Sequence, residues 1–353
     1  MAVTIRDVAK RANVSIATVS RLVNVTGRVA DDTALRVRNA IAELGFRPNA
    51  LGRNLSTSRT HTLGVLIPSL ANPVFADAVD GITEVAREHG YTLMFMSTNY
   101  DREEEEISVG KVLDYRADGL ILTVADPADS RALDMLDRFD VPYVLVYNQP
   151  NDARRPTVTV DNVQAGRDVA SALIAHGPRK LAVVSGTTRS SDRADARRQG
   201  FEARIMEQGL PQPQTVEVDY ASMDVDGALA DLFQSTPDIP TGLFCTNDLL
   251  AMTVIGACGR IGIRVPDDVS IVGFDGIGVG AQLHPTLATV VQPSREMGRV
   301  ATHQLLAQIA GEAAPGPIIL PHHLRIGESA GPPASKAPPS PITHQHRNRS
   351  ISK

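Results

Sequence analysis

Several residue types and patterns are scarce or absent in this sequence, and each absence narrows what the chain can be. There is no tryptophan among its 353 residues, so the strongest aromatic platform for stacking on a ring-shaped ligand is missing. No run of about eighteen apolar residues occurs, and the N-terminus has no apolar segment of the kind a secretory signal needs. We therefore expect no membrane span and a cytoplasmic location.

Motifs for catalysis and for metal binding are also missing. The only cysteines, Cys245 and Cys258, lie in apolar segments without metal-site spacing, so buried reduced thiols explain them best. No GxSxG, phosphate-loop or HExxH motif occurs, and the nine histidines are scattered. The nearest approach to a dinucleotide loop, GFDGIGVGA at 273–281, has Ala281 where a glycine is needed. We therefore expect no enzyme, no metal and no cofactor.

Charge is distributed unevenly along the chain, whose net charge is −5. Ten Lys or Arg and four Asp or Glu within residues 1–60 give +6, which leaves −11 for the remainder. A basic head on an acidic body favours contact with a polyanion through the head alone. A solvated basic surface would show the same charge, so charge leaves both interpretations open.

Residues 3–24 predict two short helices joined by a tight turn. Thr4 followed by Asp7 is a capping-box pattern, and Ser15 can cap the second helix. Residues at helical spacing then give each helix one apolar face: Ile5, Val8, Ala9 and Ala12 in the first, and Val19, Leu22 and Val23 in the second. A helix-turn-helix presents its recognition helix to the major groove in this way. A helical hairpin inside a larger fold would have the same pattern.

A third helix and a hinge follow the opening pair. Apolar spacing after Asp31-Asp32 predicts a helix that ends at Gly45. Pro48 then prevents helix through the preceding residue, and Asn49 can cap a helix of about one and a half turns. A helix that short is unstable alone, so we expect it to order only when something holds it.

The rest of the chain alternates apolar runs with amphipathic helical patterns, which favours parallel sheets covered on both faces. The nine predicted strands are 63–67, 91–96, 119–124, 143–147, 158–160, 181–184, 216–218, 242–245 and 269–274. The predicted helices are 74–89, 103–115, 130–139, 163–176, 195–209, 225–235, 247–261 and 295–311. Nine strands exceed one comfortable sheet, so two lobes are expected. The tail from 331 is rich in Pro, Ser and basic residues and contains no leucine heptad.

A set of motifs resembles the lactose/galactose-repressor (LacI/GalR) family of bacterial transcription factors. In the head these are TIRDVAKRANVSIATVSRLVN and TALRVRNAIAELGFRPNALGRNL. In the body they are LGVLIPSLANPVFADAVDGI, VDNVQAG, ARRQGF, TNDLLAM, RVPDDVSIVGFD and TVVQP. The resemblance implies a small all-α helix-turn-helix head, a hinge helix, and an α/β core of two doubly wound parallel-sheet lobes like a periplasmic binding protein.

The resemblance also implies domain boundaries. It predicts a DNA-binding head at 1–48, a hinge helix and linker at 49–61, an effector-binding and dimerisation core at 62–330, and a disordered tail at 331–353. The chain should cross between lobes three times. The N-lobe would then consist of 62–160 and 293–320, and the C-lobe of 161–292 and 321–329.

By the same resemblance, Ile16 and Ala17 occupy the positions that choose bases in the major groove. Their side chains offer only apolar contact, which suits thymine methyl groups. Arg21 can reach a guanine edge or a phosphate, and Leu55 corresponds to a leucine that wedges into the minor groove. Gly52, where alanine is usual, weakens the hinge helix by roughly 1 kcal/mol. The other predicted DNA contacts are Thr4, Ser15, Thr18, Ser20, Asn24 and Asn49.

The effector is expected between the lobes, at the carboxyl ends of strands. The predicted contacts are Phe75, Tyr147, Arg193, Arg197, Tyr220, Asn247, Asp275 and Gln292. For Asn247, with its neighbour Asp248, capping of the next helix is the alternative, and for Phe75 a core position is. Sugar-binding relatives commonly have an aspartate at Tyr147, and others have small residues at Arg193. The effector class therefore stays open between a sugar, a sugar derivative and a more anionic metabolite.

The resemblance implies a transcriptional repressor that works as a homodimer. One recognition helix reads only a half-site, so a dimer should bind a near-palindromic operator in double-stranded DNA. A bound effector would shift the lobes and change DNA affinity by reciprocal coupling. Two alternatives share features of the core. A transport binding protein would need a signal peptide and no basic head, and a cofactor-binding enzyme would need the missing dinucleotide loop.

Overall fold

The computed structural model describes residues 3–23, 27–46, 59–150, 155–177, 180–186, 191–220, 222, 224–234, 240–313 and 316–332. They belong to two compact units, Met1–His61 with Arg116–Asp118 and Thr62–Tyr115 with Gly119–Lys353. Several predictions lie outside the described residues. They concern Asn24, Asn49, Gly52, Leu55, the hinge helix and the tail from 333 onward.

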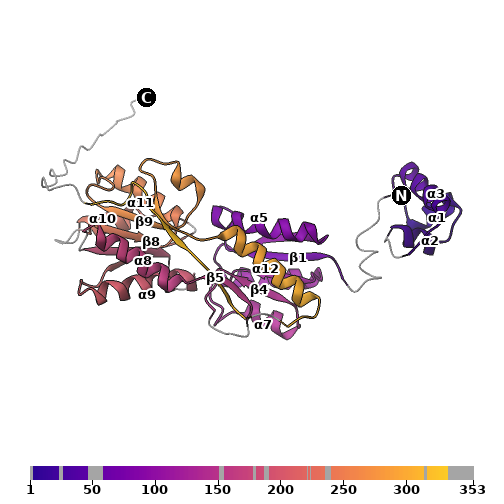
Figure 1. Cartoon of the computed structure of the whole chain (residues 1–353), viewed down its shortest axis with the longest axis horizontal. Coiled ribbons are helices and arrows are strands. Elements are labelled where there is room, and N and C mark those ends of the chain that lie inside the picture. The colour runs from indigo at the N-terminus through magenta and orange to yellow at the C-terminus, as the bar shows by residue number, and fades with distance from the viewer. Residues whose placement is uncertain are drawn as a thin grey trace, which may run out of the picture. The chain divides into compact units, whose positions relative to one another are not determined.

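The first unit contains three helices, α1 (Ile5–Ala12), α2 (Ile16–Val23) and α3 (Asp31–Leu44), the indigo segment of Figure 1. The Asp7 carboxylate accepts hydrogen bonds from the Thr4 amide at 2.8 Å and the Thr4 hydroxyl at 2.7 Å, as a capping residue at this position should. α1 ends at Asn13, whose φ of 52° is left-handed. The Ser15 hydroxyl then accepts from the Thr18 amide at 3.1 Å and begins α2.

A small apolar centre holds these three helices together. Val8, Val19 and Val37, one from each helix, are fully buried. An ion pair of 2.7 Å between Arg11 and Glu43 joins α1 to α3 at the surface, where such pairs stabilise a protein little. The head is therefore held mainly by packing of small aliphatic side chains.

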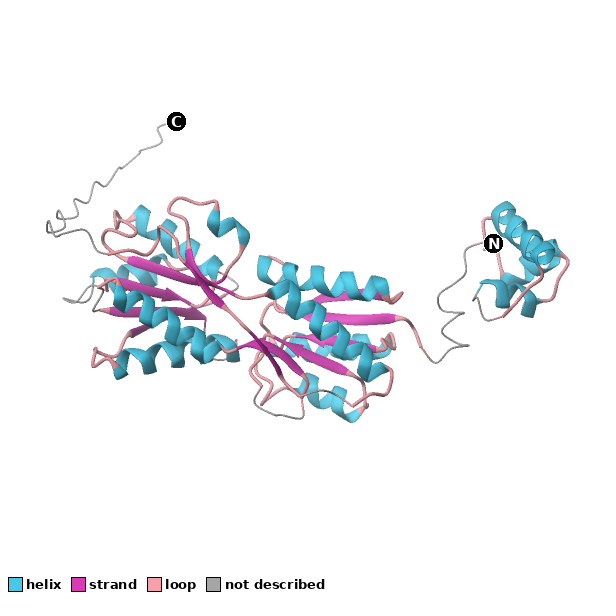
Figure 2. Cartoon of the chain, viewed as in Figure 1, coloured by secondary structure: helices cyan, strands magenta, loops and turns pink. Residues whose placement is uncertain are grey.

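The second unit contains two six-stranded sheets with helices on both faces (Figure 2). The N-lobe sheet has the order β11-β5-β4-β3-β1-β2 and the C-lobe sheet the order β12-β10-β9-β8-β6-β7. The N-lobe strands are β1 (Thr62–Ile67), β2 (Thr92–Ser97), β3 (Gly119–Leu122), β4 (Tyr143–Val146), β5 (Thr157–Val160) and β11 (Ile318–Leu320). The C-lobe strands are β6 (Leu181–Gly186), β7 (Gln214–Val218), β8 (Gly242–Cys245), β9 (Ser270–Asp275), β10 (Ala288–Val291) and β12 (His323–Arg325).

All strand pairs are parallel except β10 with β12, which pair antiparallel at the edge of the C-lobe sheet. The N-lobe helices are α5 (Pro73–Glu88), α6 (Arg102–Asp114), α7 (Arg131–Arg138) and α12 (Ser294–Ile309). The C-lobe helices are α8 (Asn162–Ala175), α9 (Asp192–Glu207), α10 (Asp226–Gln234), α11 (Asp248–Arg260) and the 3-10 helix η1 (Gly278–Ala281). This confirms the predicted fold class of a helix-turn-helix head and two doubly wound lobes.

Two details of the sequence-based prediction were wrong. The nine predicted strands omit β10, β11 and β12, which have only three or four residues each and gain their stability from pairing across the sheet. α9 begins at Asp192 rather than 195, because the Ser191 hydroxyl accepts a hydrogen bond from the Ala194 amide at 3.2 Å and caps the helix there.

Each lobe contains one pair of helices in backbone contact. A Cβ atom at Gly81 on α5 would lie 2.0 Å from the carbonyl oxygen of Arg295, on α12. A Cβ at Gly200 on α9 would lie 2.0 Å from the carbonyl oxygen of Val163, on α8. Gly298 and Gly166 make the reciprocal approaches. Only glycine fits where two helices come this close.

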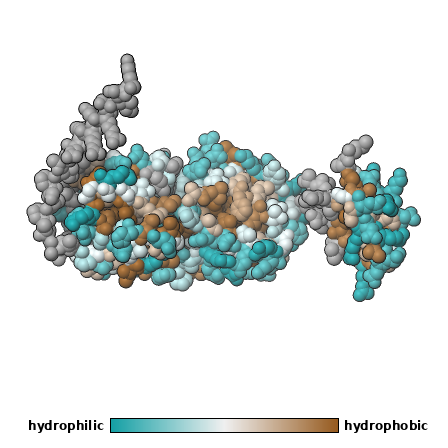
Figure 3. Space-filling view, turned by 90° about the horizontal axis from the view of Figure 1, so that it is seen from above, coloured by the Kyte–Doolittle hydropathy of each residue, from teal (hydrophilic) through white to brown (hydrophobic). Residues whose placement is uncertain are grey.

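Most large apolar side chains of the core are buried, but some remain exposed. Leu70 is 70% exposed, Phe95 on the edge strand β2 is 44% exposed and Val279 is 46% exposed. Figure 3 shows apolar residues gathered in patches among hydrophilic ones on the face it presents. Among the described residues, no helix combines the length and apolar character that crossing a bilayer requires.

Candidate functional site

A cavity of about 20 Å³ lies where the carboxyl ends of strands from both lobes face each other. Tyr147 follows β4 of the N-lobe, whereas Asn247 follows β8 and Asp275 ends β9 of the C-lobe. Open α/β sheets bind ligands at this end of their strands. The lining residues are Asn72, Val74, Phe75, Tyr100, Tyr147, Ser191, Arg193, Arg197, Tyr220, Thr246, Asn247, Asp275 and Gln292.

The structure brings together all eight residues predicted as effector contacts, since each of them lines this cavity. Their contact with a ligand stays a prediction. Five lining residues were not predicted, namely Asn72, Val74, Tyr100, Ser191 and Thr246. Thr246 directly follows β8, so the rule of strand ends could have found it. Ser191 was missed because α9 begins earlier than its apolar pattern indicates.

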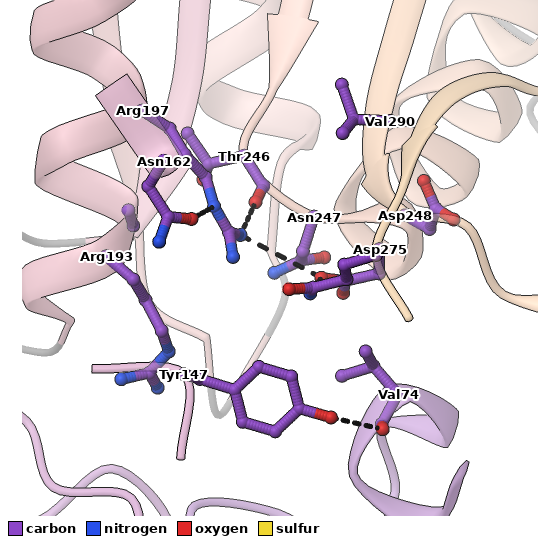
Figure 4. Close-up of polar contacts among 12 residues, drawn as sticks. Val74, Tyr147, Asn162, Arg193, Arg197, Thr246, Asn247, Asp248, Asp275 and Val290 are labelled. Atoms are coloured by element: carbon purple, nitrogen blue, oxygen red, sulfur yellow. Dashed lines mark hydrogen bonds and ion pairs between the residues drawn. The ribbon is translucent and has the colours of Figure 1, made fainter. Parts of the chain in front are cut away.

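Arg197 is a fixed buried cation, with 4% of the residue exposed. Its Nε donates to Oδ1 of Asn162 at 2.8 Å and its Nη1 to the carbonyl oxygen of Thr246 at 2.7 Å (Figure 4). The guanidinium lies 3.5 Å from the centroid of the Phe274 ring, a cation–π distance. Burial lowers the pKa of Arg197 to about 10, so the group stays charged at neutral pH.

Asp275 is the carboxylate of the cavity. It accepts hydrogen bonds from Nε2 of Gln292 at 2.8 Å and from Nδ2 of Asn72 at 3.4 Å, and it lies 3.8 Å from Nη1 of Arg197. Burial raises the pKa of Asp275 to about 6, although Arg197 and the two amides oppose this shift. Because Asn72 belongs to the N-lobe, this carboxylate also bonds across the boundary between the lobes.

The backbone around the cavity adopts conformations that side chains disfavour. Tyr100, Tyr147 and Asp275 have φ angles of 62°, 72° and 124°, in the region that favours glycine. Such residues persist only where the surrounding structure holds them, and they cluster at ligand-binding sites. Three of them in one cavity are therefore a sign of function that does not depend on side-chain chemistry.

Aromatic rings form the other walls. Phe75 and Tyr147 of the N-lobe meet edge to face with centroids 5.4 Å apart, and the Tyr147 hydroxyl donates to the carbonyl oxygen of Val74 at 2.8 Å. Tyr100 and Tyr220 lie 5.2 Å apart, and a hydrogen bond of 2.8 Å joins the hydroxyls of Tyr220 and Thr246. Phe75 belongs to the apolar core as well as to the cavity, so both of its predicted roles are compatible.

Asn247 and its neighbour Asp248 have different roles. Oδ1 of Asn247 accepts from the Leu250 amide at 2.7 Å and caps α11, while the residue also lines the cavity. Asp248 does not line it. Its carboxylate accepts from the amides of Gly276 and Ile277 at 2.8 and 2.9 Å, and from the Thr289 hydroxyl at 2.5 Å. Asp248 thus fixes the turn that follows Asp275, and burial raises its pKa to about 7.

The cavity is much smaller than a metabolite. One water needs roughly 10–15 Å³ on this measure, so 20 Å³ leaves no room for a sugar-sized molecule. A ligand of that size can enter only if the lobes separate or side chains move. Occupancy and lobe geometry are therefore coupled at this site.

The head places its predicted DNA contacts on one exposed edge. Ile16, Ala17 and Arg21 of α2 are exposed, and the exposed fraction of Ile16 is 46%, which is high for an apolar side chain. Thr18 and Ser20 are half-buried. The hydroxyls of Ser15 and Thr18 hydrogen-bond each other at 2.9 Å, and the Thr4 hydroxyl already donates to Asp7, so these groups partly serve the helix starts.

Metal-binding clusters were also searched. Within the described ranges, no group of three or more His, Cys, Asp or Glu side chains is placed to hold a metal ion. Cys245 and Cys258 are buried and free, and burial raises the pKa of both thiols.

Two family models match the chain. Residues 4–49 match the bacterial regulatory proteins of the lacI family, and residues 60–328 match the periplasmic binding proteins and sugar binding domain of the LacI family. Catabolite control protein A of Priestia megaterium is 32% identical over 332 residues, covering 93% of this chain and 99% of that protein. The transcriptional regulator GntR of Escherichia coli (strain K12) is 34% identical over 333 residues, covering 94% and 98%.

A solved structure is similar over nearly the same length. The lac repressor dimer, bound to operator and the anti-inducer ONPF, superimposes with a TM-score of 0.83 at 25% identity. The match covers 94% of this chain and all of that one. Head and core are thus matched together, in the same order, by regulators.

Proposed function

Because the chain belongs to the lacI family of bacterial regulatory proteins, which are DNA-binding transcriptional regulators with an effector-binding core, we propose a specific mechanism for it. A small polar metabolite binds in the cavity between the lobes and changes how tightly the head holds operator DNA. The relatives are regulators rather than enzymes, and the chain acts as a repressor.

The observation that carries this proposal is the cavity itself. Both lobes line it, and Asn72 of the N-lobe bonds Asp275 of the C-lobe at 3.4 Å. A metabolite that enters must replace this contact or part the lobes around it. A ligand with different affinity for two lobe arrangements shifts the balance between them, and DNA affinity shifts with it.

On the DNA side, the head reads a half-site through α2. Ile16 and Ala17 contact thymine methyl groups, and Arg21 reaches a guanine edge or a phosphate. Leu55, outside the described residues, wedges the minor groove at the operator centre. The remaining phosphate contacts come from Thr4, Ser15, Thr18, Ser20, Asn24 and Asn49.

A homodimer completes the proposal, because two heads are needed for a near-palindromic site. The exposed apolar residues Leu70, Phe95 and Val279 support a buried interface on the core, since a soluble chain rarely leaves such residues exposed in patches. Sedimentation equilibrium should give twice the chain mass. Removing residues 333–353 should leave that mass ratio unchanged, because the tail contains no heptads.

The effector half of the proposal is tested with Arg197→Ala. An operator is first selected from a random duplex pool, and its binding is followed by fluorescence anisotropy while metabolites are added. We expect Arg197→Ala to bind the operator but to lose the response, because its hydrogen bonds to Asn162 and Thr246 shape the cavity. Arg198→Ala is the control, since Arg198 pairs with Asp195 and Glu202 away from the cavity. A wild-type response from Arg197→Ala would refute the proposed site.

The DNA half is tested with Arg21→Ala. Losing a base or phosphate contact should weaken operator binding by about 10- to 100-fold, in the range of 1–3 kcal/mol. Arg36→Ala is the control, because Arg36 is an equally exposed cation on α3 that pairs with Asp32. Equal losses from the two variants would mean that α2 does not read DNA.

A further inference from the structure

Arg193 has hydrogen-bonding capacity that the fold does not use. The residue lies on α9, lines the cavity and is 5% exposed. Among the described residues, only its Nη1 has partners, the Val124 carbonyl oxygen at 3.2 Å and Oδ1 of Asp192 at 3.4 Å. The N–H groups on Nε and Nη2 remain. A buried guanidinium stays charged at any physiological pH, so unpaired donors on it are costly without an acceptor.

The nearby carboxylates are largely committed elsewhere. Asp192 accepts from Nδ2 of Asn148 at 2.9 Å and from the amide of Gln149 at 2.6 Å, both shorter than its contact with Arg193. Burial also raises the pKa of Asp192, which weakens it as a counter-ion. Asp275 is already held by Gln292, Asn72 and Arg197.

The charges that line the cavity therefore do not balance. Among the lining residues, two guanidiniums, those of Arg193 and Arg197, face one carboxylate, that of Asp275 (Figure 4). Arg197 is paired with Asp275, so one positive charge remains at Arg193. A ligand carrying one negative charge would neutralise it.

Other polar atoms suit hydroxyl groups rather than a second anion. Oε1 of Gln292 is buried without a hydrogen-bond partner among the described residues, so it can accept from a hydroxyl. Asn247 uses its Oδ1 on the Leu250 amide, which leaves Nδ2 as a donor at the cavity wall. An acceptor and a donor at different points of one small cavity match a chain or ring with several hydroxyls.

We propose that the effector is a small polyhydroxylated carboxylate, a sugar acid, and that Arg193 binds its carboxylate. This inference rests on the proposed effector function of the cavity. The planar guanidinium can hold both carboxylate oxygens in a fork, which a lysine cannot do. A sugar phosphate carries close to two charges and fits a single unbalanced cation less well.

A purely structural role for Arg193 explains less. Its contacts with Val124 and Asp192 are long for charge-assisted bonds and use one of its three nitrogen atoms. A neutral donor could make the same bond to Val124. The position of Nε and Nη2 at the cavity is what a structural role leaves without explanation.

The test uses the full-length protein and isothermal titration calorimetry. The probes are D-gluconate, D-galactonate, D-glucuronate and D-galacturonate, with D-glucose, D-galactose and glucose 6-phosphate for comparison. We expect at least one acid to bind ten times more tightly than its parent sugar. Arg193→Ser should weaken that acid by about 10- to 100-fold and change the parent sugar by less than threefold, because only the carboxylate contact is lost.

Two further variants keep the result interpretable. Arg193→Lys retains the charge without the fork and should give an intermediate affinity for the acid. Arg198→Ser, on the same helix but paired with Asp195 and Glu202, should bind the acid as the wild type does. Melting temperatures without ligand establish that each variant is folded.

The outcomes separate this inference from the proposed function. If neutral sugars bind, Arg197→Ala abolishes their binding and Arg193→Ser has no effect, the effector cavity stands and the sugar-acid class is wrong. Tightest binding of glucose 6-phosphate would also overturn the carboxylate assignment. If no probe binds, or if Arg197→Ala leaves binding unchanged, the result counts against the cavity as the effector site as well.

Discussion

The two lobes of the core have the same topology but contribute different chemistry to the cavity. In each, the first five strands and the last one along the chain give the same spatial order, sixth-fifth-fourth-third-first-second. The N-lobe supplies the rings of Phe75, Tyr100 and Tyr147. The C-lobe supplies every ionisable lining residue that is charged at neutral pH, namely Arg193, Arg197 and Asp275. Equal scaffolds therefore need not share equal roles.

Equivalent positions make this contrast concrete. Tyr147 follows the fourth strand of the N-lobe and Asp275 ends the fourth strand of the C-lobe, and both have positive φ, 72° and 124°. The same strained turn thus presents a ring from one side and a carboxylate from the other. The C-lobe decides which charges a ligand carries, while the N-lobe closes over it with apolar and hydroxyl surface.

The largest expected effect tests whether the two lobes are equally intolerant at their helix contacts. Gly81→Ala and Gly200→Ala place a Cβ 2.0 Å from a backbone oxygen of the partner helix, so each should lower the free energy of unfolding by about 3 kcal/mol. Gly256→Ala on α11 is the control, because its nearest contact would be 3.6 Å away and alanine favours the helix. Urea unfolding measures all three.

The lobes should differ in what else is lost. Gly200→Ala displaces α9, which carries Arg193 and Arg197, whereas Gly81→Ala displaces α5, which carries Phe75. We expect the effector response to be lost in the first variant and only weakened in the second. Equal losses would show that the charged and aromatic walls matter alike.

An intermediate effect concerns pH and one buried carboxylate in each lobe. Burial raises the pKa of Glu105 in the N-lobe and of Asp248 in the C-lobe to about 7, from ordinary values of 4.5 and 3.8. The folded chain therefore holds these protons more tightly than the unfolded chain. Their contribution to the free energy of unfolding is greatest below pH 4 and is lost as the pH rises to about 7.

Neutral substitutes should flatten that dependence. Between pH 4 and pH 7, Glu105→Gln and Asp248→Asn should each reduce the fall in the free energy of unfolding by about 2 kcal/mol. Chemical denaturation at several pH values gives the slopes. Curves parallel to the wild type would mean that these carboxylates are ionised normally in the folded protein.

The smallest effect compares one tyrosine hydroxyl from each lobe. Tyr147 donates to the Val74 carbonyl oxygen at 2.8 Å, and the Tyr220 hydroxyl is 2.8 Å from that of Thr246. Tyr147→Phe and Tyr220→Phe each remove one hydrogen bond and keep the ring, so each should cost about 1 kcal/mol in thermal unfolding. A loss above about 3 kcal/mol in either would indicate that the hydroxyl supports more than one neighbour.

Local signals in the sequence were sufficient for most elements. The capping residues Thr4, Ser15 and Asn247 predict helix starts that the structure contains, because a cap depends only on neighbours along the chain. The starts failed where the signal was displaced, as at Ser191, which caps α9 three residues before its apolar pattern begins. The short strands β10, β11 and β12 failed for the opposite reason, since three or four residues carry too little pattern.

The sequence alone determined the family, the order of head and core, the two-lobed fold class and the strand ends at which ligand-binding residues should lie. These features follow from motifs and periodicity, which are local properties. Only the tertiary structure decided that the eight predicted residues share one cavity, that Asp275 is already held by three donors, and that Arg193 is left with unused N–H groups. Charge balance in a cavity depends on distances between strands and helices far apart in the chain, and no local pattern encodes them.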